Sequence, residues 1–347
     1  MRTVALIPYT MTRNTPVPLT DAHNRTVRYL RLSITDRCNL RCLYCRGAKD
    51  FSPVAHENVL RYEELARLIR VAATLGIDKV RLTGGEPLTR RGFFDFLDMA
   101  RAAAPGTSLR LTTNGVLLPG NARRLAEAGV FGINISLDTL RPAKYREITG
   151  HDGFNAVRRG IDEAVSAGLC VKINAVALRG INEDDLPGFV ALARDLPLDV
   201  RFIEFMPIGD FSAWNENLYW NATDILAKAR RVAELVPETD AAGSAGPAKM
   251  WRLAGGAGRF GLITALSGHF CDSCNRLRVT SDGRLRTCLF SDKEYRLAGI
   301  LRSDKLTDDT LRRVVALAIK NKPIGHELLL ARQARAVCRK RMSAIGG

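Results

Sequence analysis

Six of the eight cysteines lie in two short groups whose spacing could support metal–sulfur chemistry. The first group has Cys-x3-Cys-x2-Cys spacing, and in the second a Cys-x2-Cys pair is followed by a third cysteine after thirteen residues. Three thiolates this close can bind three irons of a cubane cluster and leave the fourth iron open, unlike four-cysteine electron-transfer clusters. For the first group, a labile zinc knuckle or three buried thiols is the alternative. The six residues are Cys38, Cys42, Cys45, Cys271, Cys274 and Cys288.

The second group leaves both zinc and iron–sulfur interpretations open. His269 precedes this group by two residues and could complete a zinc site of three cysteines and one histidine. Arg276 and Arg278 follow, and alternation along an extended segment places both guanidiniums on one face, suited to bidentate binding of phosphate. Such a pair is less expected around a structural zinc. Cys170, on an apolar strand, and Cys338, in a basic helix, are expected to be ordinary thiols.

The segments that must position these groups alternate between short β-branched strands and amphipathic helices. Strand–helix repetition predicts a parallel sheet with right-handed crossovers. Six units indicate an α/β fold, an incomplete and open TIM-like β/α barrel, with a doubly wound open sheet as the alternative. The expected strands are Tyr29–Ile34, Lys79–Thr83, Ser108–Thr112, Gly132–Ser136, Cys170–Val176 and Val200–Glu204. The expected helices are Tyr62–Leu75, Gly92–Ala103, Asn121–Ala128, Phe154–Ala167, Asp184–Asp195 and Thr223–Val232.

Polar or glycine residues follow most of the expected strands. In parallel α/β proteins the ligand lies at the carboxyl ends of the strands, so these residues should share one mouth. A turn or a helix cap explains any single one of them, but five in series favour a ligand site. They lie at 35–37, 83–86, 112–115, 136–138 and 204–206.

The composition changes at a glycine- and alanine-rich stretch near residues 241–258. We therefore divide the chain into an N-terminal extension (1–26), the partial barrel (27–240) and a C-terminal extension (241–347) that carries the second cysteine group. The last part should contain strands Met250–Leu253 and Gly261–Leu266, followed by two or three basic helices.

The overall composition limits the class of protein. With 46% hydrophobic and 25% charged residues, the 347-residue chain can bury a core and is not wholly disordered. No apolar run approaches the ~20 residues of a membrane span, and the start does not read as a secretory signal. A cytoplasmic protein with reduced thiols is therefore expected. The net charge of +16 predicts an anionic partner such as a nucleotide, a nucleic acid or a membrane surface.

The first cysteine group resembles the signature of the radical S-adenosylmethionine (SAM) superfamily, in which an aromatic residue precedes the last cysteine, as Tyr44 does here. The segment Gly84-Gly85-Glu86-Pro87 is similar to the superfamily's element that contacts the methionine part of SAM. The resemblance implies that SAM chelates the open iron and is cleaved to methionine and a 5′-deoxyadenosyl radical. The cofactor supplies that chemistry, while the protein positions the reactants and excludes water.

The segment from Ile263 to Phe290 resembles the GTP 3′,8-cyclase family of molybdenum cofactor biosynthesis, and the likeness extends over essentially residues 25–347. It implies two 4Fe-4S clusters, the second binding the purine base of GTP through its open iron. By this resemblance, the SAM contacts are Tyr44, Gly85, Glu86, Ser136 and Met206. The GTP contacts are Arg31, Arg81, Thr112, Lys172, Arg276 and Arg278. The residues implied in catalysis are Arg276, Arg278, Gly346 and Gly347.

The resemblance also implies the reaction and its partners. The radical removes the ribose 3′ hydrogen of GTP, C3′ bonds to C8, and reduction gives (8S)-3′,8-cyclo-7,8-dihydroguanosine 5′-triphosphate. A reduced electron donor is required, and the product passes to cyclic pyranopterin monophosphate synthase. No membrane or nucleic-acid partner is expected, and a homodimer is allowed. One departure from the family is Arg46-Gly47, where the family usually has Met-Pro after the third cysteine.

Two other functions remain open at this stage. The first is a radical SAM enzyme that acts on a peptide or RNA and uses the second cluster only for structure or electron relay. The second is a zinc-stabilised module that binds nucleic acid through its basic C-terminal region. Iron analysis separates the module from either enzyme, because two cubanes contain about eight irons.

Overall fold

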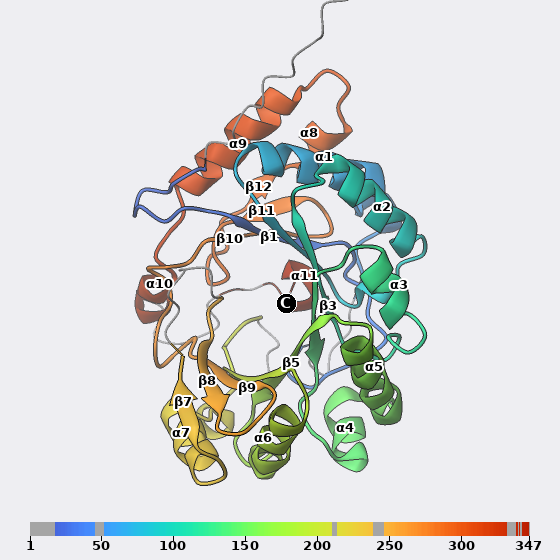
Figure 1. Ribbon diagram of the computed structural model, residues 1–347. Helices are drawn as coiled ribbons and strands as arrows, with labels where there is room; N and C mark the ends of the chain where they lie inside the picture. The colour runs from blue at the N-terminus through green and yellow to red at the C-terminus, as the bar shows by residue number, and fades with distance from the viewer. Residues whose placement is uncertain are drawn as a thin grey trace, which may run out of the picture.

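The computed structural model describes residues 18–45, 52–209, 214–238, 246–331, 338, 340 and 342–346. Its strands form one 12-stranded sheet in the order β12-β11-β10-β1-β2-β3-β4-β5-β6-β9-β8-β7. The sheet curves around a central space, with α1 to α7 outside and α11 inside the curve (Figure 1). The predicted open α/β barrel is confirmed, and the doubly wound alternative is wrong because these helices share the outer face.

The strands from β10 through β1 to β6 and on to β9 run parallel to their neighbours. All six expected barrel strands are present, and β9 and β10 extend this parallel series at its two ends. The bounds are β1 Tyr29–Ser33, β2 Lys79–Thr83, β3 Ser108–Thr113, β4 Gly132–Ser136, β5 Cys170–Ala177, β6 Asp199–Glu204, β7 Leu235–Pro237, β8 Lys249–Leu253, β9 Arg259–Ile263, β10 Arg276–Val279, β11 Arg284–Arg286 and β12 Tyr295–Arg296.

The expected helices are also present, with ends that differ by one or two residues. Helix α4 was not expected from the sequence; it begins at Pro142, and proline is well suited to the first helical turn. No helix in the described part of the chain is long and apolar enough to cross a membrane. The bounds are α1 Tyr62–Thr74, α2 Phe93–Ala103, α3 Ala122–Glu127, α4 Pro142–Thr149, α5 Phe154–Ser166, α6 Leu186–Asp195, α7 Ala222–Arg230, α8 Ala298–Arg302, α9 Asp308–Lys320, α10 Gly325–Ala331 and α11 Met342–Ile345.

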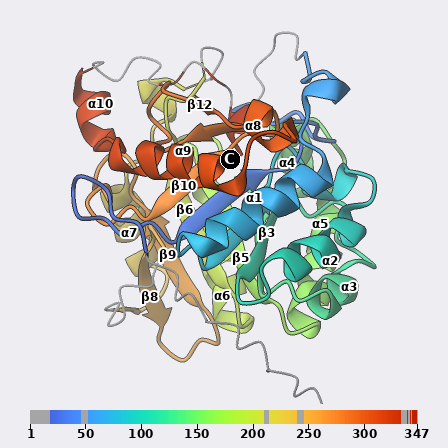
Figure 2. The same cartoon turned by 90° about the horizontal axis from the view of Figure 1, so that it is seen from above.

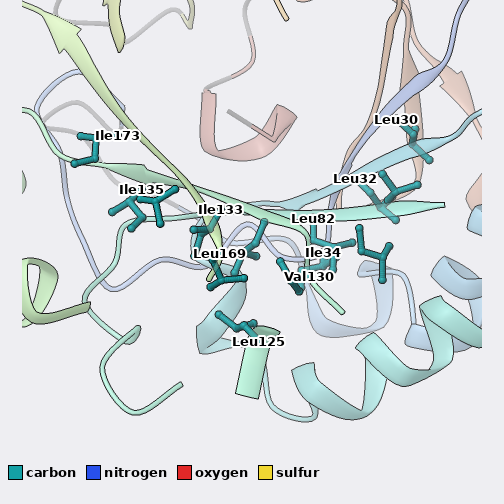
Figure 3. Packing of buried hydrophobic residues seen from close by; sticks show 14 of the residues in the cluster. Leu30, Leu32, Ile34, Leu82, Leu125, Val130, Ile133, Ile135, Leu169 and Ile173 are labelled. Carbon is teal, nitrogen blue, oxygen red and sulfur yellow. The ribbon is translucent and has the colours of Figure 1, made fainter. Parts of the chain in front are cut away.

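The side chains of the parallel strands alternate between an apolar outer face and a polar inner face. In β4, for example, Ile133 and Ile135 are fully buried, while Asn134 and Ser136 line the central cavity. Figure 3 shows such outward-facing residues packed together with Leu125 of α3. Because β-strand side chains have a period of two, the same strands build the core and supply the cavity. In most β/α barrels the interior is instead filled by apolar layers.

The C-terminal region is joined to the barrel rather than standing apart from it. Helix α9 lies beside α1 (Figure 2), and Arg67 of α1 pairs with Asp308 of α9 at 2.9 Å. Strand β10 pairs directly with β1, and β9 with β6. The region after residue 240 therefore completes both ends of the parallel sheet and helps to build the cavity.

Candidate active site

A cavity of about 620 Å³ lies inside the curved sheet and is lined by all six grouped cysteines. The first group follows the carboxyl end of β1. The second group flanks the amino end of β10, where Arg276 pairs with Tyr29 at the amino end of β1. Because these two strands are parallel, the groups lie at opposite ends of β1. Of the five polar segments expected to share one mouth at the strand ends, those at 83–86, 112–115, 136–138 and 204–206 contribute residues to the cavity lining, and the segment 35–37 does not.

The loop with the first cysteine group is fixed by backbone and side-chain contacts. Leu40 N and the Asn114 amide donate to Cys38 Sγ at 3.4 and 3.6 Å. The Tyr44 hydroxyl donates to Asp138 Oδ2 at 2.7 Å. Burial raises the pKa of Asp138 to about 6, although the hydrogen bond from Tyr44 opposes this shift. Burial, followed by the nearby Asp138 carboxylate, also raises the pKa of Cys42.

Two glycines let the chain after β2 approach this loop. A Cβ on Gly84 would lie 2.2 Å from Thr35 O, and a Cβ on Gly85 would lie 2.2 Å from Arg37 O. Gly85 N donates to Thr35 O at 2.7 Å. Any side chain at either position would therefore displace the segment that leads to the first cysteine. Gly84 and Gly85 also line the cavity.

Glu86 does not line the cavity, in contrast to the other residues expected to contact SAM. Its carboxylate is fully buried and accepts from Leu88 N, Thr113 Oγ1 and Asn114 N at 3.0, 2.8 and 2.7 Å. Burial raises the pKa of Glu86 to about 7, although the hydrogen bonds from these three donors lower it. Glu86 therefore fixes Asn114, which in turn contacts Cys38. Tyr44, Gly85, Ser136 and Met206 do line the cavity.

The second cysteine group has cationic neighbours. Lys322 Nζ and Arg276 Nη2 donate to Cys274 Sγ at 3.4 and 3.8 Å. Burial alone would raise the pKa of Cys274, but the charges of Arg276 and Lys322 outweigh it and lower the pKa to about 6. A thiolate is thus favoured at this end of the cavity.

His269, which could complete a zinc site with the second cysteine group, stacks on another ring. The ring centroids of His269 and His326 are 4.6 Å apart, and His269 does not line the cavity. Among the described residues, no three His, Cys, Asp or Glu side chains converge on a single metal ion. In a cubane, by contrast, each of the three thiolates binds a different iron.

Between the two cysteine groups the cavity wall is strongly basic. All six residues expected to contact GTP line it. Four further cations, Lys79, Arg110, Arg201 and Arg259, also line it and were not expected from the sequence. A signal exists for Lys79, because in Lys79-Val80-Arg81 the two cations stand two residues apart and share one face of the strand. The other three have no second cation at that spacing. The expected residues are Arg31, Arg81, Thr112, Lys172, Arg276 and Arg278.

Several of these groups are buried without the partners that such groups need. Thr112 Oγ1, Asn134 Oδ1 and Asn174 Oδ1 have no hydrogen-bond partner, nor do two guanidinium nitrogens of Arg201. Burial, and then the nearby Arg81, lower the pKa of Arg201 to about 10. Buried polar groups are normally satisfied, so unpartnered ones around a cavity indicate a polar, anionic ligand.

The end of the described chain enters the same cavity region. Gly346 is buried, and its carbonyl accepts from Arg278 Nη1 at 2.7 Å and from Arg31 Nε at 3.3 Å. The φ of Gly346 is +72°, a conformation that favours glycine. Gly347 and the Arg46-Gly47 departure lie outside the described residues.

A buried cluster ties this tail to the barrel. Arg286 Nη2 donates to Cys338 Sγ at 2.9 Å, and Glu294 pairs with both Arg286 and Lys340 at 2.8 Å. Cys338 forms a β-bridge with Ile208 after β6, so the expectation that Cys338 is helical is wrong. Cys170, at the start of β5, is exposed and lines the cavity.

Comparison with known proteins gives concordant matches. One family model, described as the radical SAM superfamily, matches residues 32–193, and another, described as Molybdenum Cofactor Synthesis C, matches residues 198–328. GTP 3′,8-cyclase of Moorella thermoacetica is 46% identical over 330 residues, covering 94% of this chain and 99% of that protein. GTP 3′,8-cyclase of Alkaliphilus oremlandii is 43% identical over 329 residues with the same coverage.

Solved structures show a related fold at low sequence identity. Streptococcus suis SuiB bound to its precursor peptide SuiA has a TM-score of 0.63 and 14% identity, covering 91% of this chain and 75% of SuiB. SuiB bound to S-adenosylmethionine has a TM-score of 0.59 and 16% identity, covering 84% of this chain and 69% of SuiB. At this identity, the likeness concerns the fold alone.

Proposed function

The chain belongs to the GTP 3′,8-cyclase family of radical SAM enzymes, and from this premise we propose how its residues perform the reaction. The enzyme converts GTP to (8S)-3′,8-cyclo-7,8-dihydroguanosine 5′-triphosphate in molybdenum cofactor biosynthesis. Its substrate is GTP, and SAM and an iron–sulfur cluster are its cofactors. The residue assignments below, the second cluster and the further partners are our proposals.

Cys38, Cys42 and Cys45 hold the first cluster. When bound there with SAM, this cluster supplies the 5′-deoxyadenosyl radical that removes the ribose 3′ hydrogen. Gly84 and Gly85 fit this assignment, because only a residue without a side chain permits the close backbone approach beside the cysteine loop. Tyr44, Gly85, Ser136 and Met206 surround SAM at this end of the cavity.

Glu86 acts through its neighbours and does not touch SAM. Its carboxylate holds Thr113 and Asn114, and Asn114 donates to Cys38 Sγ. It is therefore a positioning residue for the first cluster.

The triphosphate of GTP lies along the basic wall. Arg31, Arg81 and Arg278 occupy matching positions on three adjacent parallel strands, because Arg31 is in register with both others. Guanidiniums in one row can bind successive phosphate oxygens in bidentate fashion. The ordering of the row at β10, β1 and β2 is the single observation that carries the placement of GTP.

Lys172, on strand β5, completes the phosphate site. It pairs with Asp199 at 3.1 Å, and Asp199 also pairs with Arg259 at 2.7 Å. Because Arg259 remains with Asp199, Lys172 can turn to the phosphates without leaving that carboxylate unpaired. The unpartnered oxygens of Thr112, Asn134 and Asn174 are available to the ribose and base.

Cys271, Cys274 and Cys288 hold a second 4Fe-4S cluster. When bound there, it supplies an open iron for the purine base and an electron for the closing reduction. Arg276 lies beside Cys274 and faces the cavity, so it can donate a hydrogen bond to the nucleotide during closure. Gly346 orients Arg278 and Arg31 through its carbonyl.

The reaction also depends on other proteins. A reduced donor must supply electrons, and the cyclic triphosphate is passed to cyclic pyranopterin monophosphate synthase. A homodimer is compatible with this scheme. Its oligomeric state is testable by light scattering of the protein with its clusters loaded.

Anaerobic incubation with GTP, SAM and a reductant tests the function. We expect 5′-deoxyadenosine to form in step with loss of GTP, from protein that contains about eight irons per chain. SAM cleavage with no loss of GTP would favour a peptide or RNA substrate instead. Zinc without iron would favour the nucleic-acid module.

A further inference from the structure

We propose that Lys322 is the buried counter-charge of the second cluster and makes the cluster easier to reduce. This inference depends on the second cluster proposed above. Lys322 is only 2% exposed. Its Nζ donates to Cys274 Sγ at 3.4 Å, Arg276 O at 2.8 Å and Thr287 O at 2.7 Å.

These three contacts use the full donor capacity of an ammonium group. No carboxylate pairs with Lys322 among the residues that the structure describes. A buried cation without an anion costs several kcal/mol, so Lys322 requires a negative partner. Of its three acceptors, only the Cys274 sulfur can carry a full negative charge.

The backbone of Lys322 is held in place by the segment before β1. Arg25 is 4% exposed and pairs with Asp21 at 2.6 Å. Its guanidinium donates to Cys271 O at 2.9 Å and to Lys322 O at 3.0 Å. The Arg25 guanidinium thus fixes the position of the Lys322 backbone relative to the segment that contains Cys271. Residues that the sequence assigned to an N-terminal extension support the second cluster.

The chain after Lys322 lies against the other two thiols. A Cβ on Gly325, the first residue of α10, would lie 2.8 Å from Cys288 Sγ and 3.5 Å from Cys271 Sγ. Glycine is needed here because any side chain would press on the cysteine. Residues 322 to 325 therefore form one wall of the cluster site.

Lys322 and Arg276 differ in their access to the nucleotide. Arg276 lines the cavity and Lys322 does not. A bound nucleotide therefore engages Arg276, while the charge of Lys322 stays with the cluster. Three thiolates make a cubane anionic, and a fixed cation in a low-dielectric site favours the addition of one more electron.

The test measures the second cluster alone, in protein whose first group carries Cys38→Ala, Cys42→Ala and Cys45→Ala. A redox titration followed by electron paramagnetic resonance compares Lys322→Met with Lys322→Arg. The matched control is Lys320→Met, which makes the same change at an exposed position two residues earlier. For Lys322→Met we expect about a tenfold lower reduced-to-oxidised ratio at a fixed potential, or about 59 mV. Lys322→Arg and Lys320→Met should retain the potential of the parent.

An unchanged potential in Lys322→Met would overturn the proposal. If that variant binds no iron, Lys322→Gln takes its place, because the amide can still donate to a carbonyl but has no charge. Retention of the parental potential by Lys322→Gln would equally overturn it. The titration contains no GTP, so its outcome is separate from the proposed function, which fails if wild-type protein with both clusters does not consume GTP.

Discussion

The two cysteine groups share a chemistry but lie in opposite electrostatic surroundings. At the first group, the Asp138 carboxylate accepts a hydrogen bond from Tyr44. The pKa of Cys42 is raised mainly by burial and also by the negative charge of Asp138. At the second, Lys322 and Arg276 donate to Cys274 and lower its pKa to about 6.

This difference matches the charges of the two ligands. SAM carries a sulfonium cation, which an acidic side chain favours, whereas GTP is a polyanion, which cations favour. Under the proposed function, the charges around the cavity would distinguish two similar clusters and direct each ligand to its own end.

The largest expected effect comes from removing one thiol from either end. Cys42→Ser should abolish both SAM cleavage and GTP conversion, because the radical no longer forms. Cys274→Ser should abolish GTP conversion but retain SAM cleavage, since the first cluster is intact. Chromatographic quantification of 5′-deoxyadenosine and GTP distinguishes the two variants. Loss of SAM cleavage in both would mean that the ends are not separate in function.

A smaller loss of activity is expected when one arginine is removed from the row formed by Arg278, Arg31 and Arg81. Arg278→Ala should lower kcat/KM for GTP by about 100-fold or more, as removal of one hydrogen-bond donor that stabilises the transition state does in other enzymes. Lys320→Met, at an exposed position, serves as the control. SAM cleavage at the other end should persist. If Arg278→Ala retains full cyclisation with normal GTP binding, Arg278 has no role in the chemistry.

The anchor of the C-terminal tail should have a modest effect. Lys340→Met removes a partly exposed ion pair with Glu294, worth about 1 kcal/mol or less. We expect up to about a fivefold lower kcat with KM for GTP unchanged, because fewer molecules hold Gly346 against Arg278. The control is Lys293→Met, at an exposed position nearby. Steady-state kinetics checks this, and a change confined to KM would contradict it.

At the first end, the expected effect is on stability rather than on activity, and it depends on pH. Burial raises the pKa of Glu86 from 4.5 to about 7 in the folded protein. The folded state then binds more protons than the unfolded state between these values, so this contribution to stability falls as pH rises through that range. Relative to Glu86→Gln, the wild-type free energy of unfolding should fall by up to about 3 kcal/mol. Anaerobic urea titrations from pH 4.5 to 8 measure this; a difference that rises with pH would be inconsistent with a buried, ionising Glu86.

Much of the fold and the two cysteine groups could be predicted from the sequence, because both depend on short-range patterns. The repetition of strands and helices along the chain predicted the sheet, and local spacing predicted the cysteine groups. Prediction was weaker where residues far apart in the chain meet. The pairing of β10 with β1, and the contact of Arg25 with Cys271, depend on long-range register that no local pattern encodes.

The direction in which a side chain points was also difficult to predict from the sequence. Glu86 was expected to face SAM, but three nearby donors hold its carboxylate inside the wall. Lys79 and Arg201 were missed because a cation on a strand is equally compatible with a solvent-exposed barrel end. Only closure of the sheet around the cavity shows that they face inward.

Electron–nuclear double resonance on the reduced protein tests the central claim most directly. With GTP labelled by ¹⁵N in the guanine ring, we predict nitrogen coupling to the second cluster, observed in protein that lacks the first group of cysteines. With ¹⁵N-labelled SAM, coupling should appear only at the first cluster, in protein that lacks the second group. Absence of guanine coupling at the second cluster, or its appearance at the first, would contradict an account in which the two ends bind different ligands.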